Sequence, residues 1–387
     1  MKQTSRAKIL IANSTLHIGG AEEVIATLCR HIDRTRFDVS VCYLKEQGTV
    51  GEKIAAEGTE VFGIPRSRRF KTDYFTALGL RRAIRSRGVQ LVHSHDVHAL
   101  ADTTLCRLTT PGIRTVHSFH YGHYPHREKP NRRIEALCWR FLDQPVAVSR
   151  VQRDAIARLY RIPEGRIDVL WNGVDRQVGG PIPEFIARER NRGRIVIGSI
   201  NTLIPQKGMF DLLEVAARLK QQSAHPHVFL VAGEGHLRAA LESRRHALGL
   251  DDDVIFLGWV QNTARVMMDH IDVFFQPSLW EAMSIVLLEA MAAQRAIVAT
   301  AVGETPLMVE HQTSALLTDA GDIDAMAGGL SRLLASPELR LQLGANAAQR
   351  YRENFTAQAM VERHMALYDR VLARGLRSTR LLGQWSR

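Results

Sequence analysis

The amino-acid sequence predicts an α/β protein of two domains, each built on a parallel sheet covered by helices. Three observations support this prediction. The chain has 387 residues, too many for one ordinary hydrophobic core. Short runs rich in Val, Ile and Leu alternate with longer amphipathic segments, as in sheets buried on both faces. Residues 176–194, dense in Gly, Pro and charge, interrupt the alternation and are interpreted as a linker.

The first domain, residues 1–185, is expected to contain seven strands with helices between them. The apolar run at residues 7–13 opens the series, and the periodicity of Ala21–Ile32 and Thr76–Arg87 predicts helices. The other predicted strands are residues 37–44, 59–64, 89–95, 113–119, 145–149 and 167–172.

The second domain, residues 186–355, repeats the alternation. Its predicted strands are residues 194–200, 227–233, 254–260, 273–278, 296–300 and 314–318. Its predicted helices include Met209–Lys220, His236–Leu248 and Val286–Ala293, and the chain after Asp322 is mostly helical. Open α/β sheets bind ligands beyond the carboxyl ends of their strands, so two facing sheets would make a deep cleft.

The composition is that of a soluble globular protein, with 45% hydrophobic and 24% charged residues. No apolar run approaches the length of about 18 residues needed to span a bilayer, and we expect no signal peptide and a cytoplasmic location. The four cysteines show no CxxC spacing, which favours buried apolar side chains in a reducing compartment. They are Cys29, Cys42, Cys106 and Cys138.

The net charge of +11 lies entirely in the first half of the chain. Residues 1–190 carry 31 Lys and Arg against 20 Asp and Glu, whereas residues 191–387 carry 20 of each. Such charge can attract nucleic acid, anionic lipid or an anionic substrate, and a solvated surface without a partner is the alternative. No zinc finger or RNA-binding motif supports nucleic acid. The clusters are Arg66, Arg68, Arg69, Lys71; Arg81, Arg82, Arg85, Arg87; and Arg127, Lys129, Arg132, Arg133.

The end of the first strand is a candidate anion site. Gly19 and Gly20 precede a predicted helix, so the backbone can approach a ligand closely and the helix offers unpaired N–H groups. A plain strand–helix turn explains the same residues.

The segment from Pro277 to Ala292 carries two carboxylates. Glu281 lies in the loop after a predicted strand, and Glu289 lies within the apolar run of the next helix. Burial of an unpaired charge is costly, so Glu289 needs a partner, and a ribose diol or an internal arginine or amide would provide one. The helix start offers backbone N–H groups to a phosphate at Met283, Ser284, Ile285 and Val286.

Three other patterns allow competing interpretations. The histidines at positions 117, 120, 123 and 126 suggest zinc, but they lack the paired spacing of structural sites and are better interpreted as acceptor-loop residues. Asp251–Asp253 is better explained as a solvated turn than as a metal motif. Glu281 and Glu289 resemble a glycosidase pair, which the intervening helix and the phosphate-binding surroundings argue against.

Taken together, the motifs resemble those of family 4 retaining glycosyltransferases with the GT-B fold. Glu281-x7-Glu289 is similar to the family signature, and other segments agree with it in order. They are GGAE at 19–22, TVH at 115–117, AVS at 147–149, NGVD at 172–175, PQKG at 205–208, AGEG at 232–235, FLGWV at 256–260 and AVGETP at 301–306. The resemblance also implies that a C-terminal helix, residues 356–387, crosses back to the first domain.

The resemblance implies a role for each candidate residue. Glu281 would bind donor-sugar hydroxyls, Glu289 the nucleotide ribose, and Lys207 the donor diphosphate, whose growing charge an ammonium stabilises. Gly19 and Gly20 would let their loop close over the donor, and His117 would position the sugar. His117, Glu281 and Lys207 are the catalytic candidates.

One position departs from the family pattern. Thr202 stands where the family has an arginine five residues before the lysine, with Asn201 in place of a glycine, so the phosphate-gripping guanidinium is absent. Another arginine entering the site, an unusual donor or weak catalysis would each account for this, and we favour the first.

The expected activity is transfer of a sugar from a nucleotide diphosphate-sugar to a glycan or lipid-linked acceptor, without a cofactor or metal. Bacterial surface polysaccharide or lipopolysaccharide assembly fits the basic first half, as does peripheral contact with an anionic membrane. A GT-B-fold binding protein with weak catalysis is the alternative, and a sugar-nucleotide epimerase a lesser one. The base, the sugar, the acceptor and the oligomeric state are not predicted.

Overall fold

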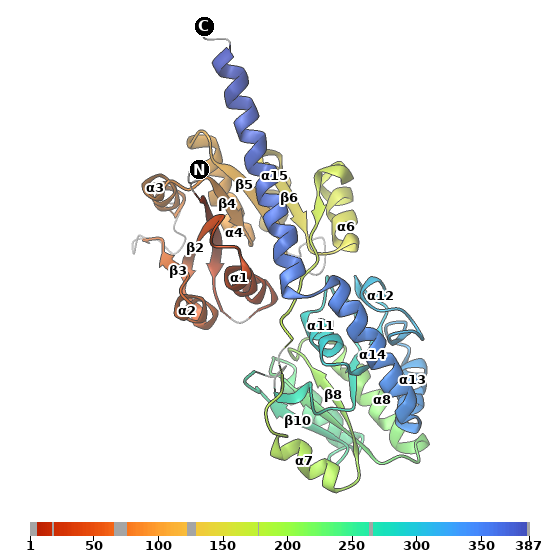
Figure 1. The fold of residues 1–387 in the computed structure, drawn as a ribbon. Coiled ribbons are helices and arrows are strands. Elements are labelled where there is room, and N and C mark those ends of the chain that lie inside the picture. The colour runs from red at the N-terminus through yellow and green to blue at the C-terminus, as the bar shows by residue number, and fades with distance from the viewer. Residues whose placement is uncertain are drawn as a thin grey trace. The chain divides into compact units, whose positions relative to one another are not determined.

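The computed structural model describes residues 6–17, 19–65, 76–121, 129–176, 178–262 and 266–384. The chain forms two compact α/β units (Figure 1). Unit 1 comprises residues 1–173 and 357–387, and unit 2 comprises residues 174–356. The sequence predicts the domain boundaries at 185/186 and 355/356. Both units contain a parallel sheet, as the sequence predicts.

Unit 1 has a seven-stranded sheet in the order β3-β2-β1-β4-β5-β6-β7. The chain runs outward from β1 to β3, returns beside β1, and continues to β7, which is the doubly wound arrangement. The seven strands correspond to the seven predicted runs. They are β1 (Ala7–Thr15), β2 (Phe37–Glu46), β3 (Glu60–Gly63), β4 (Leu91–Ser94), β5 (Arg114–Phe119), β6 (Gln144–Ala147) and β7 (Asp168–Val169).

Helices cover both faces of this sheet. They are α1 (Gly20–His31), α2 (Gly48–Ala56), α3 (Thr76–Arg87), α4 (Val97–Thr109), α5 (Lys129–Cys138) and α6 (Arg150–Tyr160), with 3-10 turns η1 (Trp139–Phe141) and η2 (Glu164–Arg166). Parallel crossovers are right-handed, so α1 and α2 lie on one face and α3, α4 and α5 on the other. The helix contacts agree: α1 packs against α2, and α4 packs against both α3 and α5.

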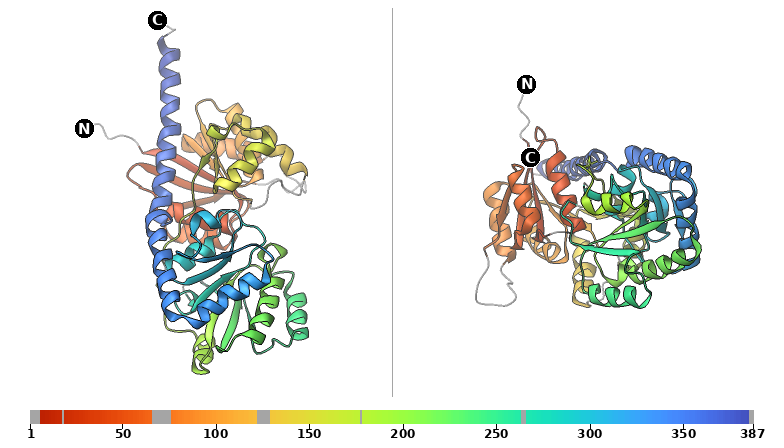
Figure 2. Two further views of the ribbon diagram at one scale, coloured as in Figure 1. Left: turned by 90° about the vertical axis from the view of Figure 1, so that its right-hand side faces the viewer. Right: turned by 90° about the horizontal axis from the view of Figure 1, so that it is seen from below.

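The C-terminal helix α15 (Ala357–Gln384) is part of unit 1, which confirms the predicted return to the first domain. It packs against α1 and β5 and is drawn as one long helix in Figure 1 and Figure 2. Met360, Leu367 and Val371 are buried along it. The ring of Tyr368 is also buried, and its hydroxyl lies 2.8 Å from Nδ1 of His93 on β4.

Unit 2 has a six-stranded sheet in the order β10-β9-β8-β11-β12-β13. Its strands are β8 (Ile195–Ile200), β9 (His227–Ala232), β10 (Val254–Gly258), β11 (Val273–Gln276), β12 (Ala296–Thr300) and β13 (Leu316–Thr318). Its helices include α7 (Glu184–Asn191), α8 (Met209–Gln222), α9 (Arg238–Ala247), α11 (Ile285–Ala292), α12 (Thr305–Met308), α13 (Ile323–Ala335) and α14 (Pro337–Asn354), with the 3-10 turn η3 (Pro205–Lys207).

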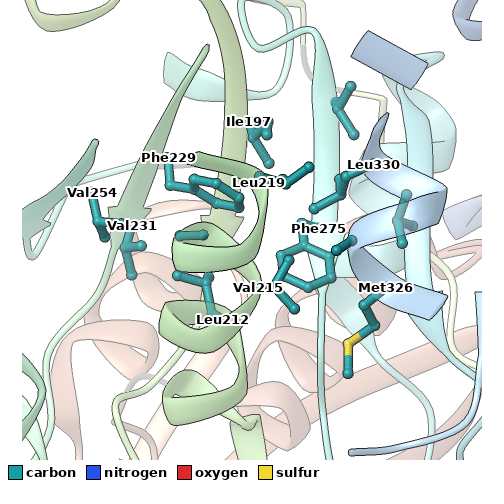
Figure 3. Packing of buried hydrophobic residues seen from close by; sticks show 14 of the residues in the cluster. Ile197, Leu212, Val215, Leu219, Phe229, Val231, Val254, Phe275, Met326 and Leu330 are labelled. Atoms are coloured by element: carbon teal, nitrogen blue, oxygen red, sulfur yellow. The ribbon is translucent and has the colours of Figure 1, made fainter. Parts of the chain in front are cut away.

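The hydrophobic core of unit 2 lies between the sheet and the helices α8 and α13. Leu212, Val215 and Leu219 of α8 point toward Phe229 and Phe275 of the sheet (Figure 3). These side chains repeat every three to four residues along α8, which is the spacing of one helix face. All five are fully buried. The core therefore holds α8 against the sheet, and only Gly208 separates η3 from the first residue of α8.

The interpretation of residues 176–194 as the interdomain linker is wrong over residues 184–191, which form α7 in unit 2. Pro183 precedes the helix, Glu184 lies in its first turn and Arg190 in its last, which suits the helix dipole. Ile186 and Glu189 are fully buried, and Glu189 lies within ion-pair distance of three arginines. Dense charge is typical of a linker, but here three of the arginines pair with one buried carboxylate.

Candidate active site

The candidate donor-binding residues of unit 2 lie in two loops at the carboxyl ends of β8 and β11. These strands are neighbours in the sheet, so the loops that follow them meet. The backbone N–H of Leu279 donates to the carbonyl of Gln206 at 2.8 Å, which joins the loop of Lys207 to the loop of Glu281. The Thr300 hydroxyl, at the end of β12, donates to the Ser278 carbonyl at 2.5 Å.

Two glycines allow these loops to approach so closely. Gly208 has φ +63°, and a Cβ there would lie 1.9 Å from the carbonyl oxygen of Pro277. Gly303 has φ +55°, and a Cβ there would lie 2.0 Å from the carbonyl oxygen of Glu281. Both positions combine a left-handed backbone with backbone contact, so any larger residue is excluded twice. Glycine in PQKG and AVGETP therefore has a geometric cause.

Lys207 and Glu281 form an ion pair. The Lys207 Nζ donates to Glu281 Oε1 at 2.5 Å, and the Ser278 hydroxyl donates to the same oxygen at 2.8 Å. The side chains are 19% and 6% exposed. Oε2 of Glu281 takes part in no hydrogen bond or ion pair with a described residue. An ammonium carries three donors, so the pair retains N–H donors on Lys207 and an acceptor oxygen on Glu281.

The start of α11 lies beside this pair in sequence and is capped from within. Ser284 is the N-cap residue: its hydroxyl accepts from the N–H of Leu287 at 3.2 Å and donates to Gln276 Oε1 at 2.9 Å. Nε2 of Gln276 is buried and has no partner among the described residues. Met283 is buried, and Ile285 and Val286 are half-buried.

Glu289 is half-buried on α11 and makes no hydrogen bond or ion pair with Lys207 or Glu281. The structure thus brings two of the three charged donor residues predicted in unit 2, Lys207 and Glu281, into contact. The ribose role of Glu289 stays a prediction.

The loop after β8 carries Asn201 and Thr202, the two residues that depart from the family pattern. Thr202 is exposed, whereas the Asn201 side chain is buried and donates to Ser199 Oγ at 2.9 Å. Within the described parts of the chain, no arginine forms an ion pair with Glu281 or a hydrogen bond with Thr202. A second arginine at this site stays a prediction.

Unit 1 contains a cavity of about 240 Å³ at the carboxyl ends of β1, β4 and β5. His117 lines it together with Ala21 and Glu22, which directly follow Gly19 and Gly20 at the start of α1. Nδ1 of His117 lies 2.9 Å from the Ser94 hydroxyl, and the ring packs edge-on against Phe119. The structure therefore places the predicted His117 and the chain after the glycine pair at one cavity.

Further residues of this cavity are not among the catalytic or donor-binding residues that the sequence predicts. His95 and His120 line it with Asn13 of β1, and Nδ1 of His95 lies 2.8 Å from Nε2 of His120. His95 Nε2 and Asn13 Oδ1 are buried and have no partner among the described residues. The recurrence of histidine at positions 117 and 120 is the available signal, and it predicts an acceptor loop that includes His120 but neither His95 nor Asn13.

Burial changes the proton affinity of the histidines around the cavity. It lowers the pKa of His120 and of His364, which α15 contributes, from 6.5 to about 4. Burial and neighbouring histidines lower the pKa of His93 and His95 well below that value. These rings are therefore neutral at physiological pH. In the described parts of the chain, no three His, Cys, Asp or Glu side chains are grouped as metal ligands.

Some predicted features lie outside the described residues, namely His123, His126, Arg127 and the cluster Arg66, Arg68, Arg69 and Lys71. The four cysteines are buried and unpaired, as expected from their spacing. No helix in the described ranges is both long and apolar enough to cross a bilayer.

Comparison with known proteins finds a family match for each unit. The sequence profile described as Glycosyltransferase Family 4 matches residues 18–178, and that of Glycosyl transferases group 1 matches residues 183–350. This chain belongs to the family 4, group 1 glycosyltransferases of the GT-B fold.

Individual relatives agree with this assignment. The Escherichia coli UDP-Gal:alpha-D-GlcNAc-diphosphoundecaprenol alpha-1,3-galactosyltransferase is 22% identical over 95% of this chain and 98% of its own. The Rhizobium meliloti lipopolysaccharide core biosynthesis glycosyltransferase LpsD is 29% identical over 54% of this chain and 59% of its own. The crystal structure of Anabaena Alr3699/HepE in complex with UDP and glucose matches 94% of this chain and 100% of its own with a TM-score of 0.81 and 19% identity.

Proposed function

We propose that this protein is a retaining glycosyltransferase that moves a sugar from a nucleotide diphosphate-sugar to a hydroxyl of a glycan or lipid-linked acceptor. Bacterial surface polysaccharide or lipopolysaccharide assembly is the process that the relatives support, since one is named for a diphosphoundecaprenol acceptor and another for the lipopolysaccharide core. A cytoplasmic enzyme with peripheral contact to the membrane fits such acceptors. The nucleotide-sugar donor is supported by the neighbour that holds UDP and glucose.

The Lys207–Glu281 pair is the observation that carries this proposal. The Lys207 ammonium donates one of its three N–H groups to Glu281, so two N–H groups remain for diphosphate oxygens. The lysine can therefore bind the nucleotide-sugar while it stays paired with the carboxylate. Charge that develops on the departing diphosphate then meets a positive group already held in place. The free Oε2 of Glu281 accepts from a sugar hydroxyl. No metal or cofactor is required for this chemistry.

The transfer step follows from these positions. The bond between the anomeric carbon and the diphosphate oxygen breaks, the acceptor oxygen forms a bond on the same face, and its proton leaves with the diphosphate. Glu289 would hold the ribose and His117 would position the sugar. Gly19, Gly20, Thr202 and the backbone of Met283, Ser284, Ile285 and Val286 would complete the donor site.

The cavity of unit 1 favours an uncharged or amine-bearing acceptor group over an anionic one. Its lining includes the carboxylates of Glu22, Asp96 and Glu135 and the neutral rings of His95 and His120. Burial raises the pKa of Glu22, whose Oε1 accepts from the Asn13 amide. Such a lining is rich in hydrogen-bond acceptors, which suit hydroxyl and ammonium groups.

The test is a panel of UDP-, GDP- and ADP-sugars, measured by thermal stabilisation and by slow hydrolysis of the donor. We expect Glu289→Ala to weaken donor affinity, and Glu281→Gln to lower turnover about 10- to 100-fold while affinity changes little. The exposed Glu353→Gln on α14 is the matched control. Unchanged kinetics in both site variants would contradict the assignments.

Thr202 favours one alternative, a protein that binds nucleotide-sugars but transfers them weakly, because a neutral side chain replaces the phosphate-binding arginine. The same panel separates the two: donor binding without hydrolysis or transfer supports the binding protein. An epimerase, the lesser alternative, would release a changed sugar nucleotide in the absence of any acceptor.

A further inference from the structure

One face of unit 1 combines exposed apolar side chains with a concentration of arginine. This face is formed by α3, α4, α5 and η1, which lie together on the side of the sheet opposite α1 and α2. We call it the α3–α5 face. The four segments contain nine Lys and Arg and two Asp and Glu, whereas α1 and α2 contain two Lys and Arg and three Asp and Glu. The excess of positive charge in the chain therefore lies largely on one side of one sheet.

The apolar side chains of the α3–α5 face project outward in helical stripes. Leu105 and Leu108 of α4 are one turn apart, and their side chains are 52% and 58% exposed. Leu137 of α5 is 62% exposed, and Phe141 of η1 follows it by one turn at 39%. Leu78 of α3 is also more than half exposed. Soluble proteins rarely place so many large apolar side chains on adjacent helices without a partner.

Arginines lie within the same stripes. On α3, Leu78 is followed one turn later by Arg82 and then by Arg85, all exposed. On α5, exposed Arg133 precedes Leu137 by one turn. Arg82, Arg85 and Arg133 form no ion pair with any described residue. Their charges are therefore not neutralised within the part of unit 1 that the structure describes.

The buried sides of these helices show that the exposed leucines are not displaced core residues. Leu100 of α4 packs with Cys138 and Leu142, and Leu80, Ala83 and Ile84 of α3 fill the core beneath the sheet. Each helix thus has its own apolar face turned inward and carries additional apolar side chains outward.

We propose that the α3–α5 face docks on the surface of an anionic lipid bilayer, with the leucines entering the headgroup boundary and the arginines contacting lipid phosphates. Apolar side chains interspersed with Arg suit the bilayer surface. Each apolar side chain favours transfer of the protein from water to the headgroup boundary, and each arginine is attracted to anionic lipid. A protein partner of acidic surface would not need five outward-facing apolar groups spread over three helices and a 3-10 turn. Under the proposed function, the α3–α5 face is the surface that brings the enzyme to a lipid-linked acceptor. The docking itself does not depend on that function.

The test is co-sedimentation of the full chain with vesicles of phosphatidylglycerol and phosphatidylcholine, and with vesicles of phosphatidylcholine alone. We expect binding to the anionic vesicles, weakened by salt, and much weaker binding to the neutral ones. Arg82→Ser, Arg85→Ser and Arg133→Ser combined should lower the partition coefficient roughly a hundredfold, about fivefold for each arginine. Leu105→Ser with Leu137→Ser should lower it roughly tenfold and leave its salt dependence unchanged.

A control variant of the same chemistry is available in unit 2. Leu341 of α14 is 75% exposed and Arg352 of the same helix is exposed, so Leu341→Ser with Arg352→Ser should leave binding unchanged. All substitutions are at exposed positions, and thermal unfolding checks that the variants remain folded. Donor hydrolysis by the same variants, measured without vesicles, tests the proposed function separately, since docking and hydrolysis can each fail alone.

Four results of the vesicle experiment would overturn the docking proposal. They are no binding of the unaltered chain to anionic vesicles, equal binding to neutral vesicles, the same loss in the control variant, or full binding by both face variants. A labelled RNA oligonucleotide provides a further arm by fluorescence polarisation. If the arginine variant loses RNA binding but keeps vesicle binding, the face binds nucleic acid and the membrane assignment is wrong.

Discussion

Acidification should weaken unit 1 selectively, because neutral histidines are buried there. His120 and His364 have pKa values of about 4 in the folded chain and ordinarily near 6.5. Between these values the unfolded chain binds protons that the folded chain does not, so stability is present at neutral pH and is lost as the pH falls.

The magnitude follows from the same two groups. Lowering the pH from about 7 to about 5 takes each histidine roughly 1.5 units below its unfolded pKa, and each unit costs about 1.4 kcal/mol. Each ring therefore removes about 2 kcal/mol, and the two together about 4 kcal/mol of an unfolding free energy that is commonly 5–15 kcal/mol. The lowered pKa values of His93 and His95 act in the same direction. The raised pKa of Glu22 acts against it, since that carboxyl gains a proton in the folded state.

Amide hydrogen exchange measured at the two pH values is the assay, after correction for the intrinsic exchange rate. Peptides from β4 and β5 report on unit 1, and peptides from β8 and β9 provide an internal control in the same molecule. His364→Gln should reduce the pH dependence of unit 1 by about 2 kcal/mol, because one titrating ring is removed. An equal loss of protection in both sheets, or an unchanged pH dependence in the variant, would refute the reasoning.

Three further predictions concern single side chains. Lys207→Met should destabilise unit 2 by about 3 kcal/mol in urea unfolding, since it leaves the Glu281 carboxylate, which is 6% exposed, without its cation. Adding Glu281→Gln should recover part of that loss. Additive effects of the two substitutions on the free energy of unfolding would contradict a coupled pair. Gly208→Ala should cost clearly more stability than Gly249→Ala, because both glycines have left-handed φ but only Gly208 would place a Cβ against backbone; equal melting temperatures would argue against this. Native Cys29 and Cys106 should resist alkylation at neutral pH until denaturant is added, because burial raises their pKa to about 12; rapid reaction of the folded chain would contradict this.

The sequence predicted the fold well because its strands are short apolar runs and its helices are clearly amphipathic. All thirteen predicted strands are present, and the periodic segment from Met209 begins α8 at the expected residue. The error at residues 184–191 has a physical origin. The buried side of α7 is small. Its buried Glu189 pairs with Arg188 of the helix and with Arg192 and Arg194 just after it, which local composition cannot indicate.

The candidate site was predictable only where one segment carries the chemistry. Lys207 and Glu281 were each found from local motifs, but their 2.5 Å contact depends on β8 and β11 being neighbours in the sheet. The pairing of His95 with His120 and the approach of His364 to His93 depend on long-range packing, so the histidine spacing alone predicts only an acceptor loop.

The return of α15 divides unit 1 into two pieces of sequence that are separated by the whole of unit 2. During synthesis, unit 2 is complete before the ribosome adds α15, whereas unit 1 must wait for the last part of the chain. Until then the His93 ring of β4 lacks the partner that Tyr368 provides from 275 positions away. A nascent or truncated chain would consequently present a finished second unit beside an unfinished first one, and shortening the C-terminus should impair the unit that lies earliest in the sequence.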